Sequence, residues 1–173
     1  MSPGPFALRI QHGTVLRFAS HEVLCNQDTG IVGGFVPPRP TAVHDLSLEI
    51  DTPHIFLRSE FPFPSDSAVQ ALEQGPKSLS IPISDDTTSL VKELHGILRK
   101  LPTEEFPSAD IYGRNIGIFW QGPDGFTWVN SAPEGCAASG STVVVTEDDK
   151  KAFDRAVAIT EILVKRGVAH EGN

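Results

Sequence analysis

Residues 141–167, with the sequence STVVVTEDDKKAFDRAVAITEILVKRG, decide the fold expected of this chain. They predict a strand followed at once by a helix, because the β-branched run at residues 142–145 suits a buried strand. Thr146 is placed to cap the helix, and three acidic residues follow it where the helix dipole favours negative charge. Gly167 is expected at the C-terminal cap. The helix face expected to pack on the sheet consists of Phe153, Ala156, Val157, Thr160, Leu163 and Val164.

Alternating apolar and polar residues predict antiparallel strands upstream of this unit. The clearest hairpin spans residues 43–61, with a turn at residues 51–54. A second hairpin is expected at residues 116–129, around the turn signal at residues 122–125. Residues 79–83 predict a strand that lies at an edge of the sheet or contains a bulge, because Pro82 cannot donate a hydrogen bond to a central ladder.

Two further expectations concern the N-terminal region and the helices. Residues 11–13 are predicted to turn the chain, so that residues 15–18 pair with residues 8–10 as a hairpin. Helical periodicity predicts a second long helix at residues 86–101, capped by one of the two aspartates at its start. Residues 65–74 predict a short helix.

These elements predict a single α+β domain over residues 1–173, with short tails at residues 1–5 and 168–173. The sheet is expected to be mainly antiparallel. Its two principal amphipathic helices, at residues 86–101 and 147–166, are expected to pack on one face.

Composition excludes several classes of function. The chain has 22 acidic and 14 basic residues, a formal net charge of −8, so binding to nucleic acid or to an anionic membrane is not expected. No apolar run has the length of a membrane span. The first residues lack the pattern of a secretory signal. Cys25 and Cys136 are the only cysteines, and they are expected as reduced thiols in a cytoplasmic protein.

Candidate catalytic residues lie in the first hairpin. His44, Asp51 and His54 could form an acid–base set if the register of the hairpin brings an imidazole beside a carboxylate. Alternation alone also explains the acidic positions, as the solvated face of a hairpin. These residue types could bind a divalent metal, but their spacing matches no known motif. No phosphate-binding glycine loop is present either, so no metal and no cofactor are expected.

The second hairpin concentrates aromatic residues. Tyr112, Trp120, Phe126 and Trp128 are candidate binding residues, because aromatic side chains dominate protein interfaces and line small-molecule pockets. The alternative is that all of them belong to the core. The spacing of the two tryptophans leads us to expect at least one that is not fully buried.

The order of predicted elements resembles that of the small proteasome assembly chaperones. The resemblance covers roughly two thirds of the chain and includes the hairpin at residues 46–57, the strand at residues 79–83, the helix at residues 90–101 and the final strand and helix. It rests on no diagnostic motif, and residues 116–140 would be an insertion. It illustrates the class of binding modules and does not assign a family.

Two functions follow as hypotheses. The first is a non-enzymatic protein-interaction or assembly module that presents an acidic face and the aromatic hairpin to a protein partner or a small apolar ligand. A homodimer is one form that such a module could take. The second is a small cofactor-independent enzyme, an isomerase, cyclase or hydrolase. It would use a histidine and a carboxylate in an aromatic-lined pocket.

Overall fold

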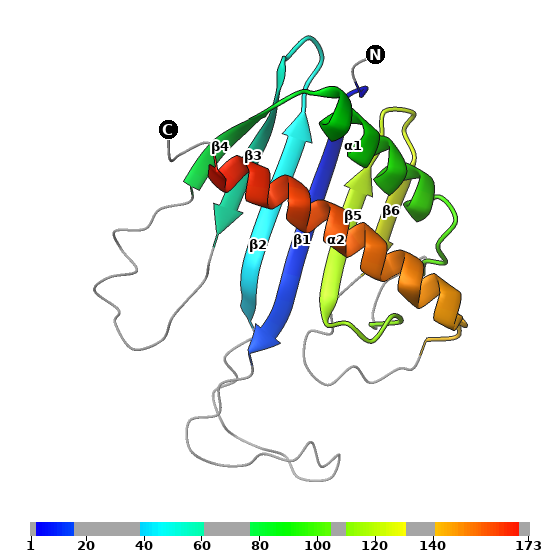
Figure 1. Cartoon of the computed structure of the whole chain (residues 1–173). Coiled ribbons are helices and arrows are strands. Elements are labelled where there is room, and N and C mark those ends of the chain that lie inside the picture. The colour runs from blue at the N-terminus through cyan, green and yellow to red at the C-terminus, as the bar shows by residue number, and fades with distance from the viewer. Residues whose placement is uncertain (1–2, 16–38, 61–76, 105–109, 131–140, 170–173) are drawn as a thin grey trace, which may run out of the picture.

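The chain forms one six-stranded antiparallel sheet and two helices, an α+β fold. The computed structural model describes residues 3–15, 39–60, 77–104, 110–130 and 141–169. Figure 1 shows both helices on the same side of the sheet. The order of the strands in the sheet is β4-β3-β2-β1-β5-β6. Their bounds are Phe6–Val15 for β1, Arg39–Leu48 for β2, His54–Glu60 for β3, Lys77–Pro82 for β4, Ile116–Gln121 for β5 and Thr127–Asn130 for β6.

The centre of the sheet corrects one prediction. β1 is a single ten-residue strand that pairs with both β2 and β5, so the predicted turn at residues 11–13 and the hairpin built on it are wrong. Gly13 adopts a φ of +51° without reversing the chain, and its amide donates to the carbonyl of Asn115. The glycine therefore allows a local irregularity inside a strand. Glycine is also common in turns, so the sequence around residue 13 does not distinguish the two cases.

Both other hairpins are confirmed. β2 pairs with β3 around a turn in which Asp51 has a φ of +62°, and β5 pairs with β6 around a turn that contains Gly125 at +80°. β4 pairs only with β3 and is an edge strand, as Pro82 predicts. Ile50, which alternation assigns to the apolar face of β2, lies in the turn beyond the strand and is 73% exposed.

Helix α1 spans Asp85–Leu98. Ser84 caps it, and the Ser84 side chain accepts a hydrogen bond from the amide of Thr87. The two aspartates that were expected to cap the helix instead occupy its first turn, where their charge still suits the dipole. The side chains that α1 buries among its expected apolar positions are Leu90, Val91, Leu94 and Leu98.

Helix α2 spans Glu147–Ala169, and its predicted N-terminus is confirmed. Thr146 Oγ1 accepts from the amide of Asp149, while a carboxylate oxygen of Asp149 accepts from the amide of Thr146. This reciprocal pair is a capping box. The helix buries Phe153, Ala156, Val157, Ile159, Thr160 and Leu163 against the sheet and α1.

Two expectations about the 141–167 unit are wrong. Residues 142–145 form no strand, and Val144 is 84% exposed. β-branched residues favour a strand only when a neighbouring strand pairs with them, and no strand of the described sheet does so. Gly167 is inside α2, which continues to Ala169. A Cβ at this position would collide with Leu57 Cδ2 on β3, so the glycine permits close packing of helix on sheet.

Some predictions lie outside the described residues. These are the short helix at residues 65–74 and the two thiols at Cys25 and Cys136. They remain predictions.

Candidate functional site

The structure places His44 apart from the other two predicted catalytic residues, Asp51 and His54. His44 is in the middle of β2, with its side chain on the helix-covered side of the sheet and only 7% exposed. Asp51 and His54 are exposed at the turn between β2 and β3. The register pairs His44 with Ser59, five residues from His54, which corresponds to roughly 17 Å along β3 at about 3.3 Å per residue. Asp51 lies beyond the end of β2, in the turn. His44 therefore shares no site with the other two.

The surroundings of His44 keep its imidazole uncharged. Its Nδ1 lies 2.8 Å from Ser59 Oγ on the neighbouring strand β3. The ring of His12 meets the His44 ring edge-on, with 6.0 Å between the centroids. Burial lowers the pKa of His44, and the nearby His12 lowers it further. His44 therefore offers a neutral ring at neutral pH.

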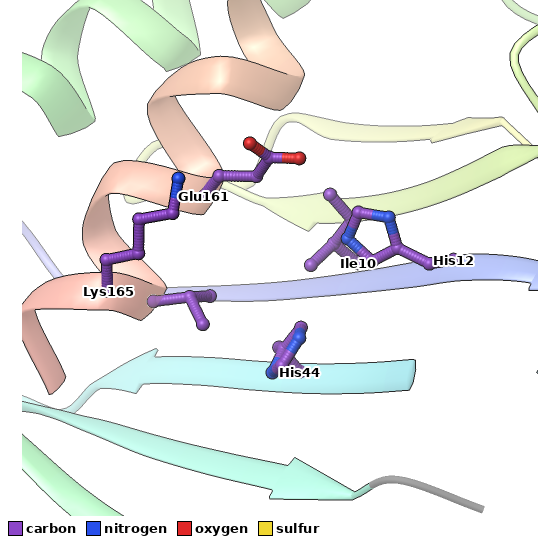
Figure 2. A pocket seen from close by; sticks show the side chains of 6 residues that line it. Ile10, His12, His44, Glu161 and Lys165 are labelled. Atoms are coloured by element: carbon purple, nitrogen blue, oxygen red, sulfur yellow. The ribbon is translucent and has the colours of Figure 1, made fainter. Parts of the chain in front are cut away.

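A pocket of about 180 Å³ opens above these histidines. It lies between strands β1 and β2 and the C-terminal half of α2 (Figure 2). The side chains that line it are Ile10, His12, His44, Glu161, Val164 and Lys165. A histidine and a carboxylate thus line one cavity, although the carboxylate comes from α2 and not from the predicted hairpin.

Of the six residues that line the pocket, only His44 was predicted from the sequence as a site residue. His12 lies in residues 11–13, which the sequence predicts to be a turn and which the structure places within β1. Glu161 and Lys165 stand on α2 among many other charged residues, with nothing in their spacing to single them out. Only the packing of α2 across β1 and β2 brings these positions together.

The predicted aromatic residues are mostly core. Trp120 is 0% and Trp128 2% exposed, so the expectation that one tryptophan remains partly exposed is wrong. Each indole N–H also has an acceptor at 3.2 Å: Nδ1 of His95 for Trp120 and the carbonyl of Leu101 for Trp128. Satisfied indole donors allow both rings to be buried under the helices.

The two other aromatic candidates also contact protein groups. The Tyr112 ring stacks on Phe153, with 4.2 Å between the centroids, and its hydroxyl donates to the carbonyl of Pro102. Burial raises the pKa of Tyr112 well above its usual range, so the hydroxyl stays protonated. Phe126 is half-buried, and the guanidinium of Arg99 lies 4.9 Å from its ring centroid.

The opposite side of the sheet carries a different surface, which we call the open face because α1 and α2 cover only the other side. Phe56 is 48% and Phe119 is 42% exposed there. The register places Phe119 beside Arg9, and Arg9 beside Asp45. The Arg9 guanidinium donates two hydrogen bonds of 2.6 and 2.9 Å to the Asp45 carboxylate.

The same row continues on β3. Arg58 is the register partner of Asp45, and its guanidinium lies 2.7 Å from Glu60. The open face thus combines two exposed phenylalanines with two arginine–carboxylate pairs. The acidic face predicted for β2 is partly neutralised, because Asp45 is paired with Arg9.

The described part of the chain contains no group of three or more His, Cys, Asp or Glu side chains arranged to hold a metal ion. Neither of its helices is long and apolar enough to cross a membrane. Comparison with protein families, with characterised proteins and with solved structures gives no significant match.

Proposed function

We propose that this chain is a non-enzymatic protein-interaction module, and that its docking surface is the open face of the sheet. The observation that carries the proposal is the exposure of Phe56 and Phe119 on a face that neither helix covers. Aromatic and arginine side chains are the residues most enriched at the energetic centres of protein interfaces. The open face presents both kinds side by side.

The occupant that these charges favour is a second copy of the chain. The whole chain carries a formal charge of −8, so most approaches of two copies bring like charges together. On the open face, Arg9 and Arg58 balance Asp45 and Glu60. A two-fold contact repeats the same patch on both partners, and a patch with both signs of charge can complement itself.

The size of the face is compatible with such a contact. Six strands about 4.8 Å apart, with an average length of about seven residues, give a flat area on the order of 650 Å². Side chains raise the accessible area above this value. A standard interface buries about 800 Å² on each partner, so the sheet can supply most of one.

The alternative function, a small cofactor-independent enzyme, has one observation in its favour. His44 and Glu161 line the same pocket. The pocket wall, however, is aliphatic at Ile10 and Val164, whereas the hypothesis called for an aromatic lining. The predicted partners Asp51 and His54 are at the far end of the hairpin. The interaction module therefore has the stronger support.

Analytical ultracentrifugation over a wide range of protein concentration tests the proposal. We expect a reversible dimer that is weakened by Phe56→Ser and by Phe119→Ser, and abolished by the double variant. Ile50→Ser is the matched control, because Ile50 is also an exposed apolar residue but lies in the β2–β3 turn. A monomer at every concentration, or a dimer that the double variant leaves intact, would contradict the proposal.

A further inference from the structure

The pocket between α2 and strands β1 and β2 is lined by two charged side chains of α2, Glu161 and Lys165, for which the described part of the chain supplies no ion-pair partner. Elsewhere on this helix, every charged side chain forms an ion pair or a capping hydrogen bond. The pairs are Glu147–Lys150, Asp148–Lys151, Asp154–Arg114, Arg155–Glu93 and Arg166–Asp86, and Asp149 bonds to Thr146. Within the described residues, the side chains of Glu161 and Lys165 form neither kind of contact. The helix therefore leaves one negative and one positive group available at the pocket.

These two groups are one helical turn apart. Residues four positions apart on a helix lie on the same face, about 6 Å from each other along the axis. Figure 2 shows both side chains extending from neighbouring turns of α2, and both line the pocket. A molecule with opposite charges a few ångströms apart could bond to both groups at once, through its carboxylate to Lys165 and its ammonium to Glu161.

The volume of the pocket and its other lining residues limit the size and the polarity of such a molecule. A volume of about 180 Å³ is below the roughly 300–1,000 Å³ of typical ligand pockets, so only a small molecule fits. Ile10 and Val164 supply an apolar wall suited to a short aliphatic group. The imidazole of His12 adds a polar edge that can donate or accept a hydrogen bond, and the ring of His44 completes this part of the lining.

We propose that this pocket binds a small zwitterion with an aliphatic side chain, that is, a free aliphatic amino acid. Lys165 binds the carboxylate, Glu161 binds the ammonium group, and Ile10 with Val164 contacts the side chain. The proposal is independent of the docking surface, because the pocket and the open face are on opposite sides of the sheet.

Nuclear magnetic resonance titration with L-valine tests the proposal against two matched probes. Isovalerate keeps the carboxylate and the branched side chain but lacks the amine, and isobutylamine lacks the carboxylate. We expect saturable shifts of the His12 and His44 ring protons and of the amides around Glu161 with L-valine. Each probe should bind about tenfold more weakly, since each loses one charged contact.

Variants identify the residues responsible. Glu161→Gln should reduce the preference for L-valine over isovalerate, and Lys165→Gln should reduce the preference over isobutylamine. Lys151→Gln is the control, because Lys151 is an exposed lysine in the first turns of the same helix. Absence of saturable shifts, equal affinity for L-valine and isovalerate, or unchanged preferences in both pocket variants would overturn the proposal.

Discussion

The indole Nε1 of Trp120 on β5 donates a hydrogen bond to Nδ1 of His95 on α1, at 3.2 Å. This contact joins the helix to the sheet through a histidine that periodicity alone places on the helix surface. The His95 side chain is only 22% exposed, and its ring also contacts Phe126 edge-on. Nδ1 can accept the indole hydrogen only while it carries no proton itself.

The first prediction follows from the protonation of this histidine. Burial, and then the nearby Arg99, lower the pKa of His95 in the folded state. The unfolded chain therefore binds the proton more tightly, so the stabilisation is complete above about pH 6.5 and is lost as pH falls toward the folded pKa. His44 contributes in the same direction, because its pKa is also lowered.

Thermal melts between neutral and mildly acidic pH measure this effect. The melting temperature of the wild type should fall on acidification, and His95→Gln should show a smaller fall. Lys151→Gln changes the surface charge but no imidazole, so it should follow the wild type. A melting temperature independent of pH in this range would refute the assignment.

The second prediction compares two glycines in helices. A Cβ at Gly167 would collide with Leu57, whereas a Cβ at Gly96 in α1 has open space around it. Gly167→Ala should therefore destabilise the fold, because the buried Leu57 side chain or the helix itself must shift to make room for the methyl group. Gly96→Ala should stabilise it by about 0.5–1 kcal/mol, since alanine loses less backbone entropy in a helix. Denaturant unfolding of both variants distinguishes this packing role from a C-cap at Gly167.

The third prediction concerns the capping box of α2. Thr146→Ala removes a side-chain bond to the amide of Asp149 and should cost about 1 kcal/mol of unfolding free energy. Thr142 is exposed and lies upstream of the cap, so Thr142→Ala is the matched control. Equal effects of the two substitutions would argue against the cap.

The fourth prediction concerns the buried tryptophans. Trp120→Ala and Trp128→Ala should each cost about 3–5 kcal/mol, because both rings are fully enclosed. Phe119→Ala, on the open face of the same hairpin, should cost much less. Chemical denaturation of the three variants measures the difference. Near-wild-type stability of either tryptophan variant would mean that its ring is not part of the core.

A strand or helix of this fold can be predicted from the sequence when residues close together in the chain determine it. The β2–β3 hairpin follows from strict alternation around a recognisable turn, and the N-terminus of α2 follows from Thr146 and its acidic neighbours. Strand β1 does not follow from a local signal, because Gly13 is typical of a turn but lies within the strand. The valine run at residues 143–145 has high strand propensity but no pairing strand in the described sheet.

The candidate sites depend on contacts between distant segments. The pocket is lined by residues 10, 12, 44, 161, 164 and 165, and the sequence holds no motif that links these positions. The open face is recognisable only once the order of the strands is known, because Phe56 and Phe119 lie on strands separated by β2 and β1. Propensity and periodicity identify elements, but neither gives the order in which strands pair.

The central claim, that the open face is where two copies meet, can be tested on the side chains themselves. Hydroxyl-radical footprinting measures the oxidation rate of each exposed side chain in dilute and in concentrated protein. We expect Phe56 and Phe119 to become protected at high concentration, while Ile50 and Val144, which are exposed outside this face, keep their rates. Unchanged rates at Phe56 and Phe119, or equal protection of all four residues, would contradict it.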